Sequence, residues 1–227
     1  MNIAYILYGF TRKLILIIQF LYFKIIQLPL WLFSYNHKGN FFKCNGRLFN
    51  CRIKLVGDNN KLIIEKNVSL KNVNIDIKGS HNTIIIKEGT VFYEGGRFRI
   101  EDYGNLIQIG KECKIGEAFF SASDFNTKII LGDNCLFSVK IILRTSDGHS
   151  IIDQDNTRIN TGGDVLIDDH VWIGYGATIL KGSHIGKNCI IGTEAIVAGK
   201  LIPDGSVVVG VGKVVKSDVN WCIERLK

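Results

Sequence analysis

The feature that most constrains this chain is an aliphatic residue that recurs every six positions after Val165. The recurring aliphatic residues are Ile167, Ile173, Ile179, Ile185, Ile191 and Val197. A second, mostly small residue follows four positions after each of them, at Val171, Ala177, Ser183, Cys189, Ala195 and Leu201. A helix repeats every 3.6 residues and a strand every two, so neither alone produces this period. Short strands joined by tight corners do, and three such sides make one triangular coil of about eighteen residues, with both kinds of residue facing inward.

The same rhythm continues upstream with a looser register. Leu131, Phe137 and Leu143 lie six apart, and segments 57–67 and 79–89 resemble each other at a spacing of 22. We expect these segments to form earlier coils that carry short outward loops. The 24 glycines and only two prolines suit many tight corners. The sequence therefore predicts an all-β solenoid over residues 36–216.

The two ends of the chain differ from this repeat. Residues 13–33, "KLILIIQFLYFKIIQLPLWLF", are apolar almost all round at helical spacing. We expect an apolar helical segment within residues 1–35, and three interpretations stay open. It lies in a membrane surface, packs on the protein or a sister subunit, or spans the bilayer. Residues 217–227 are expected to fold back as a helix or a short carboxyl-terminal cap.

Net charge and cysteine usage limit the classes of binding partner and the cellular compartment that we expect. A formal charge of +7 suits a solvated surface, anionic lipid, a phosphorylated small molecule or nucleic acid. The chain has no zinc-knuckle spacing, RNP-like string or recognition-helix pattern, so we do not expect nucleic acid as a partner. Six cysteines without a C-x-x-C pair, and no evident signal peptide, predict reduced thiols in a cytoplasmic protein. Contact between residues 1–35 and lipid would place it at the inner face of the cytoplasmic membrane.

A polar loop at 144–164, "RTSDGHSIIDQDNTRINTGGD", interrupts the six-residue rhythm and contains His149. Insertions in solenoids often build the functional site. Imidazole accepts protons near neutral pH, and a sugar hydroxyl needs a base during attack. We therefore expect His149 to be a general base, against the alternative of an ordinary surface histidine. His149, His170 and His184 lie 21 and 14 residues apart, which does not suit a three-histidine metal site, so no metal is expected.

Residues 104–216 resemble the hexapeptide-repeat acyltransferases, which fold as left-handed parallel β-helices. The run "SDGHSI" followed by "VWIGYGATILKGSHIGKNCIIG" is similar to their sugar O-acetyltransferase branch. That branch includes galactoside and maltose acetyltransferases and enzymes that acetylate capsular and lipopolysaccharide sugars. The resemblance implies acetyl-CoA as co-substrate, a homotrimer with cofactor sites between neighbouring chains, and direct acetyl transfer to a saccharide acceptor.

Side-chain chemistry suggests roles for Asp147 and Arg144 near His149, and the resemblance adds one for Trp172. Asp147 either orients the imidazole as a catalytic residue or only shapes the Asp-Gly turn. Arg144 contacts an anionic acceptor or is simply exposed. Trp172 should point outward, where the family has the border of the acceptor and cofactor channel; trimer packing is the alternative, and both can hold.

The cofactor path follows from the same resemblance. The backbone N–H of Tyr175 corresponds to the donor that faces the thioester oxygen. Thr193 and Ala198 match positions that line the pantetheine arm, and Lys213 and Lys216 match basic positions near the adenosine phosphates. The chain departs from the family at 209–212, where Val-Gly-Val-Gly replaces the usual Gly-x-Pro-Ala, and this puts the adenine pocket in doubt.

The resemblance, together with these residues, implies an enzyme that moves an acetyl group from acetyl-CoA to a hydroxyl of a bacterial surface saccharide, either capsule, lipopolysaccharide or a precursor. Two alternatives remain open. An amino sugar nucleotide could be the acceptor, because an amine needs the same base. A catalytically idle solenoid could serve assembly or membrane attachment.

Overall fold

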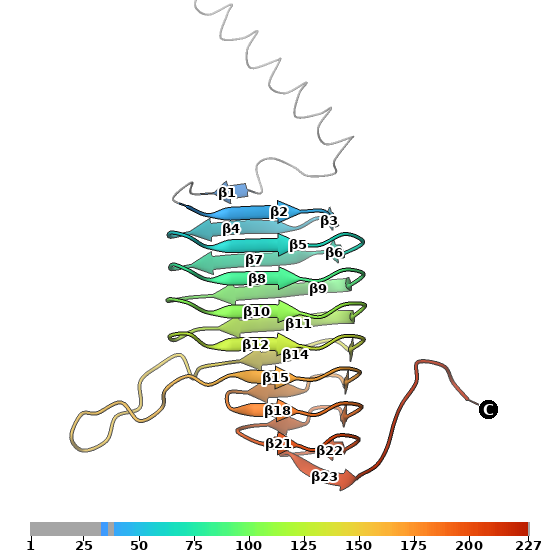
Figure 1. The fold of residues 1–227 in the computed structure, drawn as a ribbon. Helices are drawn as coiled ribbons and strands as arrows, with labels where there is room; N and C mark the ends of the chain where they lie inside the picture. The colour runs from blue at the N-terminus through green and yellow to red at the C-terminus, as the bar shows by residue number, and fades with distance from the viewer. Residues whose placement is uncertain (1–32, 36–38, 227) are drawn as a thin grey trace, which may run out of the picture.

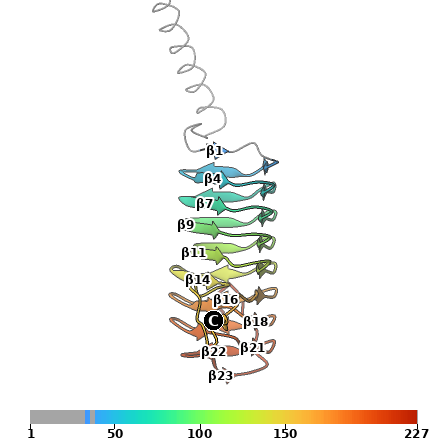
Figure 2. The ribbon, with the colours of Figure 1, turned by 90° about the vertical axis from the view of Figure 1, so that its left-hand side faces the viewer.

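The chain forms an all-strand solenoid in its computed structural model, which describes residues 33–35 and 39–226 (Figure 1). Strands one coil apart pair in parallel throughout the stack, and Figure 2 shows the rungs piled along one axis. The predicted β-solenoid is therefore confirmed, while its left-handed sense stays a prediction. No helix among the residues described is long and apolar enough to cross a membrane.

Each coil passes through three faces. Face 1 is a sheet of eight strands: β2 (Phe41–Cys44), β5 (Lys61–Ile64), β8 (Thr83–Ile86), β10 (Leu106–Ile109), β12 (Lys128–Leu131), β15 (Val165–Ile167), β18 (Ser183–Ile185) and β21 (Leu201–Ile202). Face 2 contains β3 (Arg47–Phe49), β6 (Ser69–Lys71), β13 (Leu136–Phe137), β16 (Trp172–Ile173), β19 (Ile190–Ile191) and β22 (Val207–Val209). Face 3 contains β1 (Phe33–Tyr35), β4 (Arg52–Val56), β7 (Val73–Lys78), β14 (Ile141–Arg144), β17 (Thr178–Leu180) and β20 (Ile196–Val197).

Two long strands join faces 2 and 3. β9 (Val91–Ile100) pairs with β6 through its first residues and with β7 through its last, and β11 (Lys114–Ala122) pairs in the same way with β13 and β14. The chain runs from face 1 to face 2 to face 3, and we name the corners between them 1/2, 2/3 and 3/1.

The coils come in two sizes. Stacked residues in the early coils lie 22 or 23 positions apart, as Asn60 and Asn82, then Asn82 and Asn105 do. In the late coils His170 and Asn188 lie 18 apart. Both the six-residue rhythm and the longer early repeat are thus confirmed. Between them, Asp133 and Asp169 are stacked although 36 positions separate them, because the loop after β14 is inserted in that coil.

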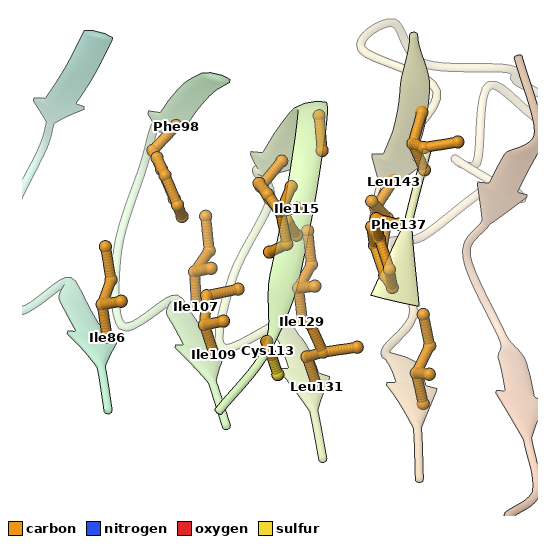
Figure 3. Packing of buried hydrophobic residues seen from close by; sticks show 14 of the residues in the cluster. Ile86, Phe98, Ile107, Ile109, Cys113, Ile115, Ile129, Leu131, Phe137 and Leu143 are labelled. Atoms are coloured by element: carbon orange, nitrogen blue, oxygen red, sulfur yellow. The ribbon is translucent and has the colours of Figure 1, made fainter. Parts of the chain in front are cut away.

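The interior is filled by the aliphatic residues that the period predicted. Ile167, Ile173, Ile179, Ile185, Ile191 and Val197 are all at most 1% exposed. In the middle coils the core also holds phenylalanine, and the Phe98 and Phe120 rings stack with centroids 4.8 Å apart. Figure 3 shows Ile86, Ile107 and Ile129 of successive face 1 strands pointing into one continuous core. Burial of this apolar stripe is the main term that stabilises the stack.

One position of the predicted pattern is wrong. Leu201 was expected to face inward, but it is 72% exposed and pairs with His184, while Ile202 pairs with Ile185 and is buried. This last coil is one residue shorter, since Lys187 and Asp204 are stacked at a separation of 17. A shift of one residue in a strand turns every side chain to the opposite side.

A buried ladder of polar side chains runs down corner 3/1. Asn60 and Asn82 are fully buried and Asn105 is 1% exposed. The Oδ1 of each accepts the backbone N–H of the equivalent residue one coil later, with N···O distances of 2.7–3.0 Å. The Nδ2 of each donates to a corner carbonyl of that later coil. The ladder ends at Thr127, whose hydroxyl bonds Thr145 at the base of the inserted loop.

The two ends depart from expectation in different ways. The predicted apolar helix lies outside the described residues, apart from Phe33–Tyr35, which form β1 and pair with β4. The predicted carboxyl-terminal cap is not found. β23 (Lys213–Lys216) pairs antiparallel with β22 at the end of the stack, and residues 217–226 contain no helix or strand. Figures 1 and 2 show this tail running back beside the coils, where Trp221 donates to the carbonyl of His170 at 2.8 Å and stacks on its ring.

Replacing a ladder asparagine tests this account of the fold. We expect Asn82→Ala to lower the free energy of unfolding by about 1–3 kcal/mol, because it leaves the buried backbone N–H of Asn105 without its acceptor. Urea unfolding measures the change. Asn74→Ala, an exposed position on β7, is the control and should cost under about 0.5 kcal/mol. Equal stability of the two variants would contradict the role of the ladder.

Candidate active site

The loop at 145–164 leaves the stack at corner 3/1, between β14 and β15 (Figure 1). Its outer part is a small hairpin. Ile152 and Arg158 form an antiparallel bridge, and the N–H of Ile159 donates to the carbonyl of Ile151 at 2.9 Å. At the tip, the Asp153 carboxylate accepts the N–H of Thr157 at 2.9 Å. The loop is therefore a folded projection at one edge of the solenoid.

Asn160 is the centre of this loop. The residue is 8% exposed, and its Nδ2 donates to Asp147 Oδ2 at 2.7 Å and to the carbonyl oxygen of His149 at 2.8 Å. Its Oδ1 accepts the N–H of Ile151 at 2.7 Å. One amide side chain thus holds the backbone at His149 and Ile151 together with the side chain of Asp147.

The returning limb of the loop is fastened to the coil before it. The Arg158 guanidinium makes two hydrogen bonds to the carboxylate of Asp124, one of them an Nη1–Oδ1 contact of 3.0 Å. Asp124 Oδ2 also accepts the N–H of Gly162 at 2.9 Å. The bonds from Arg158 and then from the Gly162 N–H hold the pKa of Asp124 below its usual value.

The outgoing limb is fastened to the coil after it. Lys181, at corner 3/1 of the next coil, places its Nζ 2.6 Å from Asp147 Oδ2 and 3.1 Å from the carbonyl of Thr161. Lys181 first and Asn160 second lower the pKa of Asp147. The partners of this carboxylate are those two residues, and the part of the chain that the structure describes shows no bond from it to the His149 ring. This arrangement favours the loop-shaping alternative for Asp147, and its catalytic role stays a prediction.

His149 itself is exposed in the middle of this fastened loop. Its carbonyl bonds Asn160, whereas its ring makes no hydrogen bond to any residue in the described ranges. Arg144 ends β14 at the base of the loop, exposed, near the Asp147–Gly148 turn. The backbone at position 149 is therefore held while the imidazole is accessible to a substrate.

Trp172 and Tyr175, which were predicted to border the acceptor and cofactor channel, lie on another face and another corner of the solenoid than the His149 loop. Trp172 is on face 2, is 40% exposed, and has the ring of Trp221 at a centroid distance of 6.0 Å. Tyr175 lies at corner 2/3, 37% exposed, with Lys140 Nζ 5.3 Å from its ring centroid. Its N–H has no hydrogen-bond partner within residues 33–35 and 39–226, so this donor is free to meet a ligand.

The predicted cofactor residues continue from Tyr175 toward the carboxyl-terminal end. Thr193 stands one coil below it at corner 2/3 and is exposed, and Ala198 is exposed just after β20. Lys213 and Lys216 are both exposed on β23, at the last rung. All four are accessible but they do not lie in one line, since Thr193 is at corner 2/3, Ala198 is at corner 3/1 and the two lysines are on the strand that pairs with β22 of face 2. Their roles stay predictions.

A single chain does not bring these groups together. Tyr175 and Thr193 occupy corner 2/3, while the loop with His149 occupies corner 3/1, so the width of face 3 separates them. No cluster of three or more His, Cys, Asp and Glu side chains suited to a metal ion occurs in the portion described.

The anchors of the loop were missed by sequence reasoning. Asn160 and Arg158 lie in the inserted loop, while Asp124 and Lys181 are corner residues that the six-residue period does not single out. A weak signal was present, since the polar side chains of Arg158 and Asn160 in "NTRIN" flank the apolar Ile159. Their partners lie 34 and 13 positions away and become visible only when the coils are stacked.

Similar proteins agree with this fold. No family model matches the chain. The polysialic acid O-acetyltransferase of Escherichia coli O1:K1 is 32% identical over 120 residues, which cover 52% of this chain and 38% of that protein. The chain thus spans well under half the length of this curated relative.

Two solved structures match over most of their length. The crystal structure of the polySia-specific acetyltransferase NeuO is 31% identical, with a TM-score of 0.73, over 82% of this chain and 86% of that one. The polysialic acid O-acetyltransferase OatWY is 26% identical, with a TM-score of 0.77, over 83% and 90%. Together with the six-residue repeat, the His149 loop and the solenoid, these similarities show that the chain belongs to the hexapeptide-repeat acyltransferases, in their sugar and polysaccharide O-acetyltransferase branch.

Proposed function

We propose that this protein transfers an acetyl group from acetyl-CoA to a hydroxyl of a bacterial surface saccharide. The observation that carries the proposal is the inserted loop. It is fastened to the coils on both sides and leaves the His149 ring exposed, with no hydrogen bond to it from residues 33–35 or 39–226. Loops positioned by a rigid scaffold commonly carry catalytic groups. The names of the similar proteins support a saccharide hydroxyl as the acceptor.

The proposed chemistry is a direct transfer. A ring nitrogen of His149 takes the proton of the acceptor hydroxyl while the hydroxyl oxygen attacks the thioester carbonyl carbon. The negative charge that develops on the carbonyl oxygen is stabilised by a hydrogen bond from the free N–H of Tyr175. The carbon–sulfur bond then breaks, the acetyl ester forms, and the CoA sulfur receives the proton from the imidazolium. No covalent enzyme intermediate is needed.

His149 belongs to corner 3/1 and Tyr175 to corner 2/3, so one chain holds the two groups apart by the width of face 3. This separation argues for a site shared by neighbouring chains. His149 would approach a thioester that lies along corner 2/3 of another copy, close to that copy's Tyr175 and Thr193. A closed ring of three copies provides such a contact at every interface. We therefore propose the homotrimer, and with it a cytoplasmic enzyme whose residues 1–35 contact the membrane surface where lipid-linked glycans are held.

Removal of the base tests the mechanism. We expect His149→Ala to lower the rate of acetyl transfer roughly 10²- to 10⁴-fold, because the acceptor hydroxyl loses its proton acceptor. Release of free thiol from acetyl-CoA, with a bacterial surface glycan as acceptor, measures the rate. His184→Gln, on face 1, is the control and should keep full activity. Full activity of His149→Ala would sink the proposal, and a product resistant to mild alkali would identify N-acetylation instead.

Asn160 should matter through the position of His149. We expect Asn160→Ala to lower kcat roughly 10- to 100-fold with KM for acetyl-CoA unchanged, since a small displacement of a catalytic group is costly. Limited proteolysis should at the same time show faster cleavage within residues 145–164. Thr157→Ala alters the same hairpin farther from His149 and serves as the control. A variant with lower activity but an equally protected loop would argue against a positioning role.

The attachment of the loop should depend on pH. The lowered pKa of Asp124 means that its carboxylate stabilises the folded state fully above about pH 4, the usual Asp value, and progressively less as the pH falls below it. We expect Asp124→Asn to reduce the melting temperature at pH 6 and to narrow its difference from the wild type at pH 3. Thermal unfolding at the two pH values measures this, and an equal difference at both would refute it.

A further inference from the structure

The tail after β23 returns along the stack and places Trp221 against the coil that contains Trp172. The N–H of Val219 donates to the carbonyl of Gly205 at 2.9 Å, which fastens the tail at corner 1/2 of the last coil. Two residues later, Trp221 Nε1 donates to the carbonyl of His170 at 2.8 Å. The tail is therefore held at two points, on the last coil and on the coil two rungs before it.

The Trp221 indole contacts two rings of that earlier coil. It stacks on the His170 ring with a centroid distance of 4.2 Å and an interplanar angle of 5°. The Trp172 ring lies 6.0 Å away at an angle of 50°, a separation at which tilted aromatic rings attract each other. His170 is held in turn from the following coil, since its Nδ1 is 3.0 Å from Asn188 Oδ1. One connected set of contacts thus runs from Asn188 to the Trp172 ring.

Trp172 has few other groups that fix the direction of its side chain. The strand register puts Leu136 above it and Ile190 below it in the outward column of face 2. The residue is nonetheless 40% exposed, and in the described part of the chain its Nε1 has no hydrogen-bond partner. Trp221 is the aromatic ring that meets it from outside the stack. The orientation of the Trp172 indole therefore depends on the docked tail.

The place of Trp172 connects this arrangement to the proposed reaction. Trp172 precedes Tyr175 by three residues, so about 10 Å of extended chain separates their backbones. In the proposed function the thioester lies at Tyr175, and the acceptor hydroxyl attacks it there. An exposed indole at this distance can pack its apolar face against the ring of the acceptor sugar.

We propose that Trp221 is a positioning residue for acceptor binding, which holds the Trp172 indole in the direction that the saccharide needs. The inference rests on the proposed function for the place of the acceptor, and it adds the tail, residues 217–226, to the parts that build the site. Without the Trp221 ring, the Trp172 side chain reaches other rotamers and the saccharide binds more weakly. Acetyl-CoA, along corner 2/3, binds as before.

Steady-state kinetics separate this role from a structural one. Acetyl transfer by the full chain is measured with polysialic acid as the acceptor probe, because similar transferases are named for it. We expect Trp221→Ala to raise KM for the acceptor roughly tenfold and to change kcat and KM for acetyl-CoA less than about twofold, since one aromatic contact is lost. Trp221→Phe keeps a ring beside Trp172 and should restore most of the affinity. Leu226→Ala, 82% exposed in the same tail, is the control and should match the wild type.

Circular dichroism follows the ring pair without any substrate. Two indoles 6.0 Å apart couple their electronic transitions and give a paired positive and negative signal in the far ultraviolet. The signal needs both rings. We therefore expect Trp172→Phe and Trp221→Phe each to remove it, while Leu226→Ala keeps it.

Each outcome decides the inference. A paired signal that survives in Trp221→Phe, a less stable Trp221→Ala with unchanged KM values, a fall in kcat alone, or an equal rise of KM in Leu226→Ala would overturn it. A higher acceptor KM in Trp221→Ala that Trp221→Phe largely restores supports it. If both single variants lose the signal and yet the wild type acetylates no saccharide, the docking of Trp221 on Trp172 stands and the proposed function fails.

Discussion

Backbone hydrogen bonding between successive coils is the constraint on which this structure depends. Each short strand finds its partners only in the strand above and the strand below it, so every coil must return the chain to the same three directions. As a result, side chains of the same chemical kind lie above one another in columns. Aliphatic residues fill the interior, asparagines form the ladder at corner 3/1, and the phenylalanine rings of the middle coils lie on one another.

The same constraint explains where an insertion can be tolerated. A loop inserted at a corner leaves the register of the strands on both sides unchanged, as the pairing of β12 with β15 across the inserted loop shows. The buried ladder ends at Thr127 and Thr145, so the chain enters the loop from a fixed point. Asp124 and Lys181, from the coils before and after, then hold the two limbs of the loop. A rigid stack thereby presents His149 outside the core at a defined position, which suits a residue that must act on a bound substrate.

Much of the fold could be predicted because its signal is local and repeated. The period of six placed Ile167 through Val197 inside, and a spacing of 22 identified the early coils. Leu201 shows the limit of that reasoning. One missing residue in the last coil moved it to the surface, and the sequence continued to look periodic. The end of the chain also differed, since the tail holds Trp221 against His170 beside the stack and does not cover its end.

The candidate site was likewise predictable only in part. The sequence by itself determined the solenoid, the inserted loop and the choice of His149 as its notable residue, because residue type and spacing along the chain carry that information. Only the tertiary structure decided that Asn160 fixes the backbone of His149, that Asp147 bonds Lys181, and that Trp221 lies against His170 and Trp172. These relations join residues from different coils, from the tail and a coil, or from the two limbs of one loop. They exist only once backbone pairing has set the register of the stack, and no local pattern in the chain records them.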